Sequence, residues 1–284
     1  MTRVFIFPGQ GSQSLGMGKE LWDRFPREVE QADDILGYSI RRLCLEDPNS
    51  QLKQTEFTQP ALYVVCVLAY LNRLQSGDPL PSAVAGHSLG EYAALYAAGA
   101  FDFATGLRLV SKRGVLMAQV RGGGMVAILG LTADKIASVL ARPEFAGVEI
   151  SNNNSPSQFV ISGPVEAVQE ASRVLEESGA KRCVQLQVSG AFHSQSLRAV
   201  AATFRRFIDP IDFQVLRIPV VANVTACPYP TGQIHDLLAS QISSPVRWTE
   251  SVQYLLTEGA TEFVEVGPGN QLTGMVQQIR RNFS

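Results

Sequence analysis

One serine of the chain lies in a setting typical of a nucleophile. Residues 86–90 read Gly-His-Ser-Leu-Gly, after a short apolar segment (81–86) and before an alanine-rich helical segment (91–100). The pattern Gly-x-Ser-x-Gly at a strand-to-helix turn favours a nucleophile elbow, in which Ser88 projects from a strained corner. The amide of Leu89, at the start of the helix, would then face negative charge developing on a substrate oxygen. A plain small-residue turn is the alternative.

A serine hydroxyl needs an adjacent base at neutral pH, and the chain has three histidines. His193 follows a segment whose secondary-structure rhythm differs from the rest of the chain, so we expect it at a domain cleft, where it can serve Ser88. An ordinary interdomain histidine is the alternative. We expect His87 to point away from Ser88 and to have a structural role, and His235 to face solvent near a helix cap.

The third member of a serine triad has no obvious candidate. Asp102 and Asp134 lie between Ser88 and His193 in sequence, where α/β-hydrolases place the acid. Neither aspartate ends a predicted core strand. The simplest inference is that something other than a carboxylate, such as a backbone carbonyl, orients the histidine.

Strand-like and helix-like segments alternate along the chain, which predicts an α/β fold. The run 3–7 is a predicted strand that ends in a glycine-dense loop, and 218–225 is another. Helices are predicted at 18–37, 58–75, 101–120 and 196–207, followed by two more helices, a strand at 261–267 and a final helix.

Residues 125–190 predict a small inserted domain. Their segments follow the order strand, helix, strand, strand, helix, strand, which is typical of a ferredoxin-like βαββαβ unit. Residues 1–124 and 191–284 are expected to form an α/β-hydrolase-like catalytic domain. Because the connections are short, the two parts should pack together with a cleft between them.

Composition excludes several classes of protein. A chain of 284 residues with 45% hydrophobic residues can bury a large core, and its formal net charge of −2 disfavours a nucleic-acid surface. Its longest apolar run, 61–71, is shorter than the roughly 20 residues that cross a bilayer, and the first apolar run meets Pro8 without a signal-type cleavage sequence. The scattered cysteines favour reduced thiols in a cytoplasmic protein without a disulfide framework or a metal site: Cys44, Cys66, Cys183 and Cys227.

Seven motifs occur in the order found in the malonyl-CoA:acyl carrier protein transacylases, which the chain resembles over essentially its full length. They are FPGQGSQ (7–13), GHSLGEY (86–92), KRGVLM (112–117), NNSPSQFVISG (153–163), GAFHS (190–194), SPVRW (244–248) and EVGPGNQLTGMV (265–276). The segments 36–48 and 55–65 are most similar to discrete acyltransferases that serve modular polyketide synthases in trans.

The resemblance implies roles for the residues around the serine. Ser88 would carry the acyl group and His193 would be its base, held by a backbone carbonyl around Arg247. The backbone amides of Gln10 and Leu89 would form the oxyanion hole. For Gln10, the exposed amides of a glycine-rich loop are compatible with that role.

Substrate choice is implied by a second group of residues. In the family, the arginine that matches Arg113 forms a bidentate pair with the malonyl carboxylate, a geometry that lysine cannot copy. Without the family, a surface salt bridge would be the default for Arg113. The bulk of Phe192 would crowd an α-methyl group. Asn154 matches a family residue at the cleft, and Gln59 is expected to line the pocket.

The activity implied is a ping-pong transfer. Ser88 takes a malonyl group from malonyl-CoA as an ester and passes it to the phosphopantetheine thiol of an acyl carrier protein, with His193 moving the proton each time. No metal, bound cofactor, nucleic acid or membrane is implied, and we expect a cytoplasmic monomer. The alternatives are a fatty-acid malonyl transacylase, a hydrolase that clears stalled carrier proteins, and a non-catalytic docking subunit. Three basic pairs could contact an acidic carrier protein, or could only face solvent on a helix surface: Arg41–Arg42, Arg205–Arg206 and Arg280–Arg281.

Overall fold

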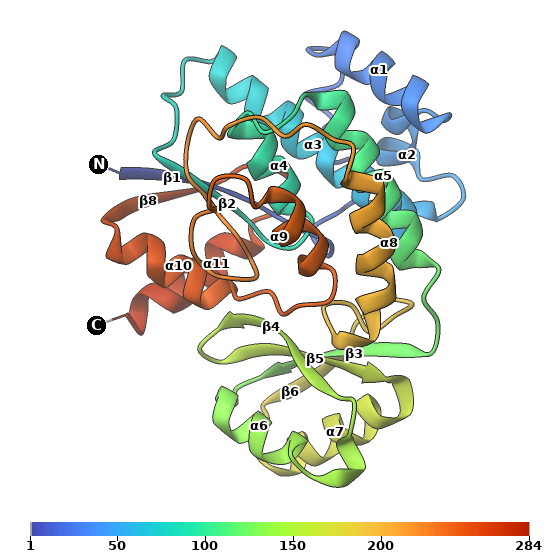
Figure 1. Cartoon of the computed structure of the whole chain (residues 1–284), viewed down its shortest axis with the longest axis vertical. Helices are drawn as coiled ribbons and strands as arrows, with labels where there is room; N and C mark the ends of the chain where they lie inside the picture. The colour runs from blue at the N-terminus through green and yellow to red at the C-terminus, as the bar shows by residue number, and fades with distance from the viewer. Residues whose placement is uncertain (1, 284) are drawn as a thin grey trace.

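Two four-stranded sheets, one parallel and one antiparallel, organise the computed structural model, which describes residues 2–283 (Figure 1). The α/β prediction is confirmed at this level. The parallel sheet has the order β7-β2-β1-β8 and contains β1 (Thr2–Phe7), β2 (Ala83–Gly86), β7 (Val220–Val221) and β8 (Ala260–Glu265).

Both faces of the parallel sheet are covered. Residues 4–7 of β1 are fully buried, and alternate side chains along a strand point to opposite faces. Phe5 and Phe7 belong to a core that includes α3 (Thr55–Gln75), α4 (Gly90–Ala97) and α5 (Phe103–Ala118). Val4 and Ile6 belong to a second core, with α10 (Trp248–Thr257) and α11 (Gln271–Arg281).

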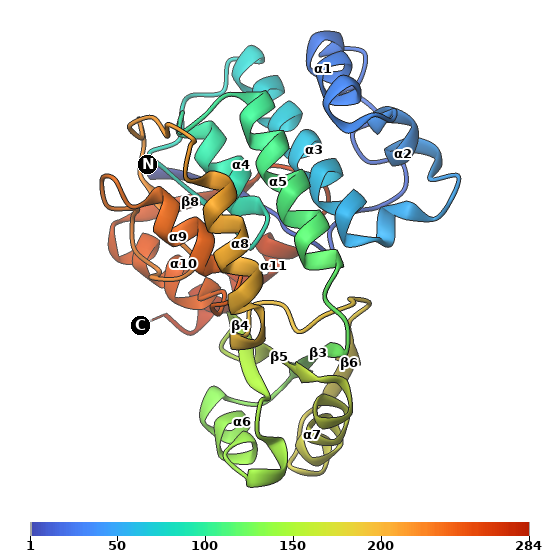
Figure 2. The same ribbon diagram turned by 45° about the vertical axis from the view of Figure 1, so that its right-hand side comes forward.

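The antiparallel sheet has the order β4-β5-β3-β6, and its elements follow one another in the predicted βαββαβ order. They are β3 (Gly123–Leu129), α6 (Ala133–Leu140), β4 (Glu149–Ser155), β5 (Gln158–Pro164), α7 (Val165–Glu177) and β6 (Arg182–Gln185). Helices α6 and α7 lie on the face of this sheet that points away from the rest of the protein (Figures 1 and 2). Met125, Ala127 and Val160 on the opposite face join the large core.

The two parts meet along β4. Val246 forms a β-bridge with Asn152, Thr249 at the start of α10 donates to the Asn153 carbonyl, and Ser155 donates to Gln278 of α11. These contacts hold the antiparallel sheet against the helices on one side of the parallel sheet, so the active-site residues of both parts can face each other.

The remaining helices surround the parallel sheet. They are α1 (Pro26–Leu36), α2 (Ile40–Glu46), α8 (Arg198–Ile208) and α9 (Ile234–Gln241), with 3₁₀ turns η1 (Gln51–Lys53), η2 (Pro143–Phe145) and η3 (Gln195–Leu197). Within residues 2–283, none of the helices combines the length and apolar character needed to cross a membrane.

Three predicted elements are shorter than expected. The helix predicted from residue 18 begins only at Pro26, because 18–24 form successive turns. The strand predicted over 218–225 keeps only β7, since the chain turns away where Asn223 bonds to the serine turn. The last strand of 125–190 ends at Gln185, because β3 pairs with it only over residues 182–185.

Candidate active site

Ser88 lies on a tight turn between β2 and α4, with a positive φ of 51°. Few residues other than glycine adopt this region, and such strain concentrates at functional sites. The two flanking glycines make the turn possible. A Cβ on Gly86 would lie 2.0 Å from the Gly90 carbonyl carbon, and one on Gly90 would lie 2.0 Å from the Phe7 carbonyl oxygen. The Gly-x-Ser-x-Gly spacing is therefore required by close backbone packing.

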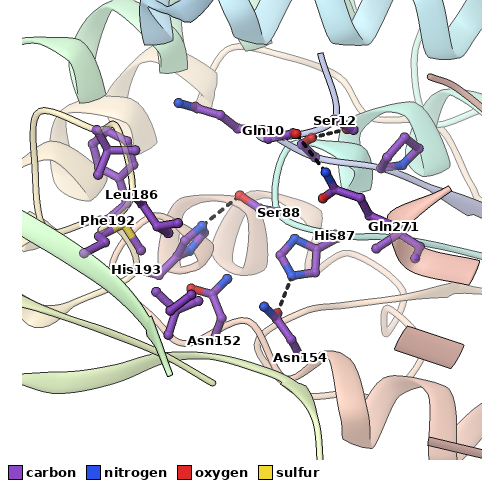
Figure 3. Close-up of a pocket in the computed structure, with 18 of the residues that line it drawn as sticks. Gln10, Ser12, His87, Ser88, Asn152, Asn154, Leu186, Phe192, His193 and Gln271 are labelled. Carbon is purple, nitrogen blue, oxygen red and sulfur yellow. Dashed lines mark hydrogen bonds between the residues drawn. The ribbon is translucent and has the colours of Figure 1, made fainter. Parts of the chain in front are cut away.

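His193 is the residue that the structure brings to Ser88. The Ser88 Oγ and the His193 Nε2 are 2.7 Å apart (Figure 3). The other ring nitrogen, Nδ1, faces the carbonyls of Gln241 at 2.9 Å and Ser244 at 3.2 Å. Because carbonyls only accept hydrogen bonds, Nδ1 carries the proton and Nε2 is free to accept one from the serine.

The histidine is oriented by carbonyls other than the one predicted at Arg247. Helix α10 begins directly after Arg247, so the Arg247 carbonyl already accepts from the backbone and side chain of Ser251. The carbonyls that reach the imidazole come from the C-terminal end of α9, at Gln241, and from Ser244. An orienting carbonyl was expected around Arg247: Ser244 begins the same 244–248 motif, whereas Gln241 lies outside it and the Arg247 carbonyl itself bonds elsewhere.

The imidazole of His193 is neutral. The residue is buried, and burial, with repulsion from Arg113, lowers the pKa of His193 to about 3, although the bonds to the two carbonyls oppose the shift. A neutral imidazole whose free nitrogen points at a hydroxyl is a general base ready to accept its proton.

Arg113 lies beside the nucleophile and is only 1% exposed. Its guanidinium donates to the side-chain oxygens of Gln59 at 2.9 Å, Gln241 at 3.0 Å and Ser88 at 3.1 Å. The surface salt bridge is therefore excluded. All three acceptors are neutral, so the guanidinium has the charge to bind an anion next to the serine hydroxyl.

A pocket of about 300 Å³ opens in front of the serine and the histidine. Of the predicted residues, Gln10, Asn154 and Phe192 line it with Ser88 and His193 (Figure 3). Gln59 and Arg113 line it as well. Apolar side chains from both parts of the protein complete the wall: Met117, Met125, Val160, Leu186 and Val188. The pocket thus has one polar end, at the nucleophile, and an apolar side.

Two amides near the serine are free. Among residues 2–283, the backbone N–H groups of Gln10 and Leu89 donate to no other residue, whereas that of Ser88 donates to Asn223 at 2.7 Å. The side chain of Leu89 is buried and does not line the pocket.

His87 and His235, the two histidines not expected to be the base, lie in different surroundings. His87 bonds through Nε2 to Asn154 Oδ1 at 2.8 Å and packs against Trp248, which supports a structural role, although His87 also lines the pocket. His235 was expected to face solvent. Instead it is half-buried, bonds to the Ile211 carbonyl at 2.9 Å and packs its ring edge against Phe213.

Three functional-site residues were missed by the sequence analysis. Gln241 donates to the Ser88 carbonyl and accepts from Arg113, while its own carbonyl holds His193. Asn223 and Glu91 form a hydrogen-bonded layer beneath the serine turn. The one available signal was an acidic residue, Glu91, inside an otherwise apolar helix.

The two aspartates considered as the third member of a triad lie elsewhere. Asp102 caps α5 by accepting from the Thr105 amide, and Asp134 lies in the first turn of α6. Among the residues that the structure describes, no group of three or more His, Cys, Asp and Glu side chains could hold a metal ion.

Comparison with known proteins gives a consistent set of similarities. The family model of the acyl transferase domain matches residues 4–283. A polyketide biosynthesis malonyl CoA-acyl carrier protein transacylase of Bacillus velezensis is 51% identical over 280 residues, or 98% of this chain and 96% of the relative. The crystal structure of a malonyl CoA-acyl carrier protein transacylase from Burkholderia pseudomallei matches with a TM-score of 0.97 at 45% identity, covering 100% of this chain and 99% of that one. A malonyl-transacylase solved in complex with its type II polyketide synthase acyl carrier protein matches with a TM-score of 0.94 at 37% identity, over 99% of this chain and 94% of that one.

Proposed function

The chain belongs to the acyl transferase domain family, and we propose that it transfers a malonyl group from malonyl-CoA to the phosphopantetheine thiol of an acyl carrier protein. One observation carries the choice of acyl group. Arg113 is buried beside the Ser88 hydroxyl and donates only to neutral oxygens. Such a guanidinium favours an acyl group that brings its own carboxylate, which can pair with it bidentately.

The first half-reaction acylates the enzyme. The Ser88 oxygen attacks the thioester carbonyl of malonyl-CoA while His193 Nε2 takes its proton, and the resulting imidazolium gives that proton to the departing CoA thiolate. The negative charge on the carbonyl oxygen is stabilised by the amides of Gln10 and Leu89. The product is a malonyl ester on Ser88.

The second half-reaction runs the same steps with the other thiol. His193 removes the proton of the phosphopantetheine thiol, the thiolate attacks the Ser88 ester, and the proton returns to the serine oxygen. These groups supply the deprotonation and the charge stabilisation, so the reaction we propose needs no metal or bound cofactor.

Phe192 disfavours acyl groups with a branch at the α carbon. Its side chain is buried in the pocket wall next to His193. A branch at the carbon between the two carbonyls would have to occupy the space that the ring fills. Asn154 acts here indirectly, by holding His87 at the pocket.

A hydrolase that clears stalled carriers has the same nucleophile and base, so it is the second candidate. The buried Arg113 disfavours it, because a general acyl hydrolase has no use for a carboxylate clamp beside the serine. A docking subunit without activity is disfavoured by the 2.7 Å contact between Ser88 and His193. A role in polyketide biosynthesis is supported by the name of the 51% identical relative, and we propose that the enzyme acts there in trans, with fatty-acid synthesis as the alternative.

The carrier protein is proposed to dock beside Lys53 and Arg121. Both line a recess of about 390 Å³ that shares Val188 with the active-site pocket. Arg121 donates to the carbonyls of Ala118 and Val120, but neither cation forms an ion pair with another described residue, so both keep an unbalanced positive charge for the phosphate of the arm or an acidic carrier.

Several of the basic residues considered first are engaged elsewhere. Arg205 pairs with Asp209 and Asp236, and Arg41 and Arg42 pair with acids of their own. Arg280 donates to the Thr261 carbonyl.

We propose that 125–190 is a ferredoxin-like domain inserted into an α/β-hydrolase-like catalytic domain, 1–124 and 191–284, of a cytoplasmic protein. The βαββαβ order, the strand order β4-β5-β3-β6 and a separate core support the small domain, and the serine turn after a parallel strand supports the large one. Since β3 begins at Gly123, the first junction lies slightly before residue 125.

Intact mass measurement tests the proposal directly. Incubation of the purified protein with malonyl-CoA alone should add one malonyl group, and a holo carrier protein added afterwards should remove it. Ser88→Ala should show no adduct. An undiminished adduct in Ser88→Ala would overturn the mechanism, and loss of the ester to water at the same rate with and without carrier would favour the hydrolase.

A further inference from the structure

Glu91 is a buried carboxylate that the proposed reaction does not use. It lies in the first turn of α4 and is 0% exposed. One carboxylate oxygen accepts the backbone N–H of Asn223 at 2.8 Å, and the other accepts the hydroxyl of Tyr229. A buried carboxylate costs free energy unless hydrogen bonds and a nearby cation compensate its charge. The groups around Glu91 therefore indicate what this carboxylate does.

Asn223 connects this carboxylate to the nucleophile. Its side-chain oxygen accepts the Ser88 backbone N–H at 2.7 Å, and its side-chain nitrogen donates to the Gly86 carbonyl at 2.6 Å. The Asn223 side chain thereby fixes the backbone of the strained turn at both Gly86 and Ser88. Glu91 fixes the backbone of Asn223, so one residue separates the carboxylate from the serine.

Glu91 and Arg113 belong to one buried cluster: the Arg113 guanidinium donates to Gln241, and burial raises the pKa of Glu91 while the positive charge of Arg113 opposes the rise. The groups around its carboxylate come from four segments: Arg113 of α5, Tyr92 of α4, Gln241 of α9, and Asn223 and Tyr229 of the chain between β7 and α9. Burial raises the pKa of Tyr92 and of Tyr229 above the ordinary value, so both phenols stay neutral. Within the described residues, Arg113 and Glu91 are thus the two charges of this buried cluster.

We propose that Glu91 positions Ser88 through Asn223, serves as the counter-charge of Arg113 in the empty enzyme, and takes up a proton from solvent when a carboxylate-bearing acyl group binds to Arg113. This inference rests on the proposed function, in which the malonyl carboxylate pairs with Arg113. The bound carboxylate then replaces Glu91 as the anion that balances the guanidinium.

The direction of the coupling follows from the charges. Burial raises the pKa of Glu91 to about 7, against the bonds from Tyr229 and Asn223 and the attraction of Arg113, which lower it. A second anion at Arg113 offsets that attraction and raises the pKa of Glu91 further. Because the complex then binds more protons than the free enzyme, malonyl-CoA affinity falls as the pH rises through 7.

Neither histidine near the serine produces this dependence. Burial is the main cause that lowers the pKa of His193, to about 3, and that of His87 below its usual value. Both imidazoles remain neutral around pH 7. A proton taken up there on malonyl binding therefore belongs to Glu91.

Calorimetry on Ser88→Ala, which binds the thioester but cannot react, measures the proton directly. Titration with malonyl-CoA in two buffers of different ionisation enthalpy should show uptake of roughly half a proton per site at pH 7. Acetyl-CoA, which carries the same phosphates and lacks the carboxylate, should show none. In Ser88→Ala with Glu91→Gln, the malonyl-linked uptake should disappear.

Tyr229→Phe gives a second test that does not remove the carboxylate. Loss of the phenol removes a hydrogen bond that lowers the pKa of Glu91, so the midpoint of the pH-dependent affinity should move upward. Malonyl-linked uptake that persists in Glu91→Gln, or is absent with Glu91 intact, overturns the inference. Failure of the proposed function looks different: the otherwise native protein then forms no malonyl ester at all.

Discussion

The amide group of Gln241 is shared between the nucleophile and the anion-binding residue: its Nε2 donates to the Ser88 carbonyl at 2.9 Å, and its Oε1 accepts from Arg113 at 3.0 Å. Its main-chain carbonyl accepts from His193 at 2.9 Å. The end of α9 therefore sets the relative positions of three groups that come from distant parts of the chain. Displacement of this one residue would disturb nucleophile, base and substrate selection together.

Removal of the base should slow acylation without removing the serine. His193→Ala is expected to lower the rate of malonyl ester formation by about 10²–10⁴-fold, which is the usual contribution of a positioned general base. Rapid-quench mass measurement of the acylated fraction follows the rate. His235→Ala is the matched control, since it removes a histidine that bonds only outside the site, and its rate should stay at that of the unmodified enzyme.

Arg113 should select the acyl group. Arg113→Ala is expected to lose malonyl transfer and to gain, relative to it, transfer of acetyl groups, because a neutral acyl chain has no use for the guanidinium. The loss corresponds to about 3–5 kcal/mol, as for other unpaired buried charges. Arg113→Lys should restore little, since lysine cannot bind a carboxylate bidentately.

The ratio of kcat/KM for malonyl-CoA and acetyl-CoA is the measurement for both variants. Arg108→Ala, on an exposed position of the same helix, is the control and should leave the ratio unchanged. Equal losses for both thioesters in Arg113→Ala would mean that the arginine supports the structure and does not choose the substrate.

The lowered pKa of His193 predicts the acid side of the activity profile. In Glu91→Gln, where residue 91 no longer titrates, kcat/KM for acetyl-CoA should stay level from pH 8 down to about pH 5. The reason is that an imidazole with a pKa of about 3 remains a free base across this range. A fall with a midpoint near 6.5, the ordinary histidine value, would contradict it.

The glycines of the serine turn should be intolerant of a methyl group. Gly86→Ala and Gly90→Ala each place a Cβ 2.0 Å from backbone atoms, which side-chain rearrangement cannot relieve. We expect each to lower the free energy of unfolding by about 3 kcal/mol or more, measured by chemical denaturation. Gly274→Ala in α11 is the control, because its Cβ would meet nothing within 4 Å. Its stability should be unchanged or slightly higher.

Local patterns predicted the reacting pair and little of what supports it. Ser88 was found because a strand, two glycines and a helix surround it within one short segment. His193 was found because it follows the last strand of the inserted unit. Asn223 lies 135 residues from Ser88 in sequence, and no spacing rule connects an asparagine in a strand-like segment to a distant serine.

The carbonyl that orients His193 shows the same limit. Any residue has a carbonyl, so the amino-acid type carries no signal, and its position depends on where α9 ends and α10 begins. Helix ends are set partly by tertiary contacts, which explains why the prediction fell on Arg247 instead of Gln241 and Ser244. The length of the strand at Val220 was overestimated because Asn223 is drawn into the bonds beneath the serine turn.

Carrier recognition should depend on charge at the recess beside the pocket. Lys53→Glu and Arg121→Glu reverse two unpaired cations there and should raise KM for the carrier protein by roughly tenfold. Exposed ion pairs contribute only about 0–1 kcal/mol each, so the effect of reversal comes from added repulsion and slower association. Acylation of Ser88 by malonyl-CoA, which does not need the carrier, should change much less.

Raised salt should likewise raise KM for the carrier protein with the unmodified enzyme. Arg280→Glu, at the far end of α11, is the control, since the N-terminal residues of that helix line the pocket and residue 280 does not. A carrier KM that ignores both salt and the two reversals would assign recognition to apolar contacts along the cleft.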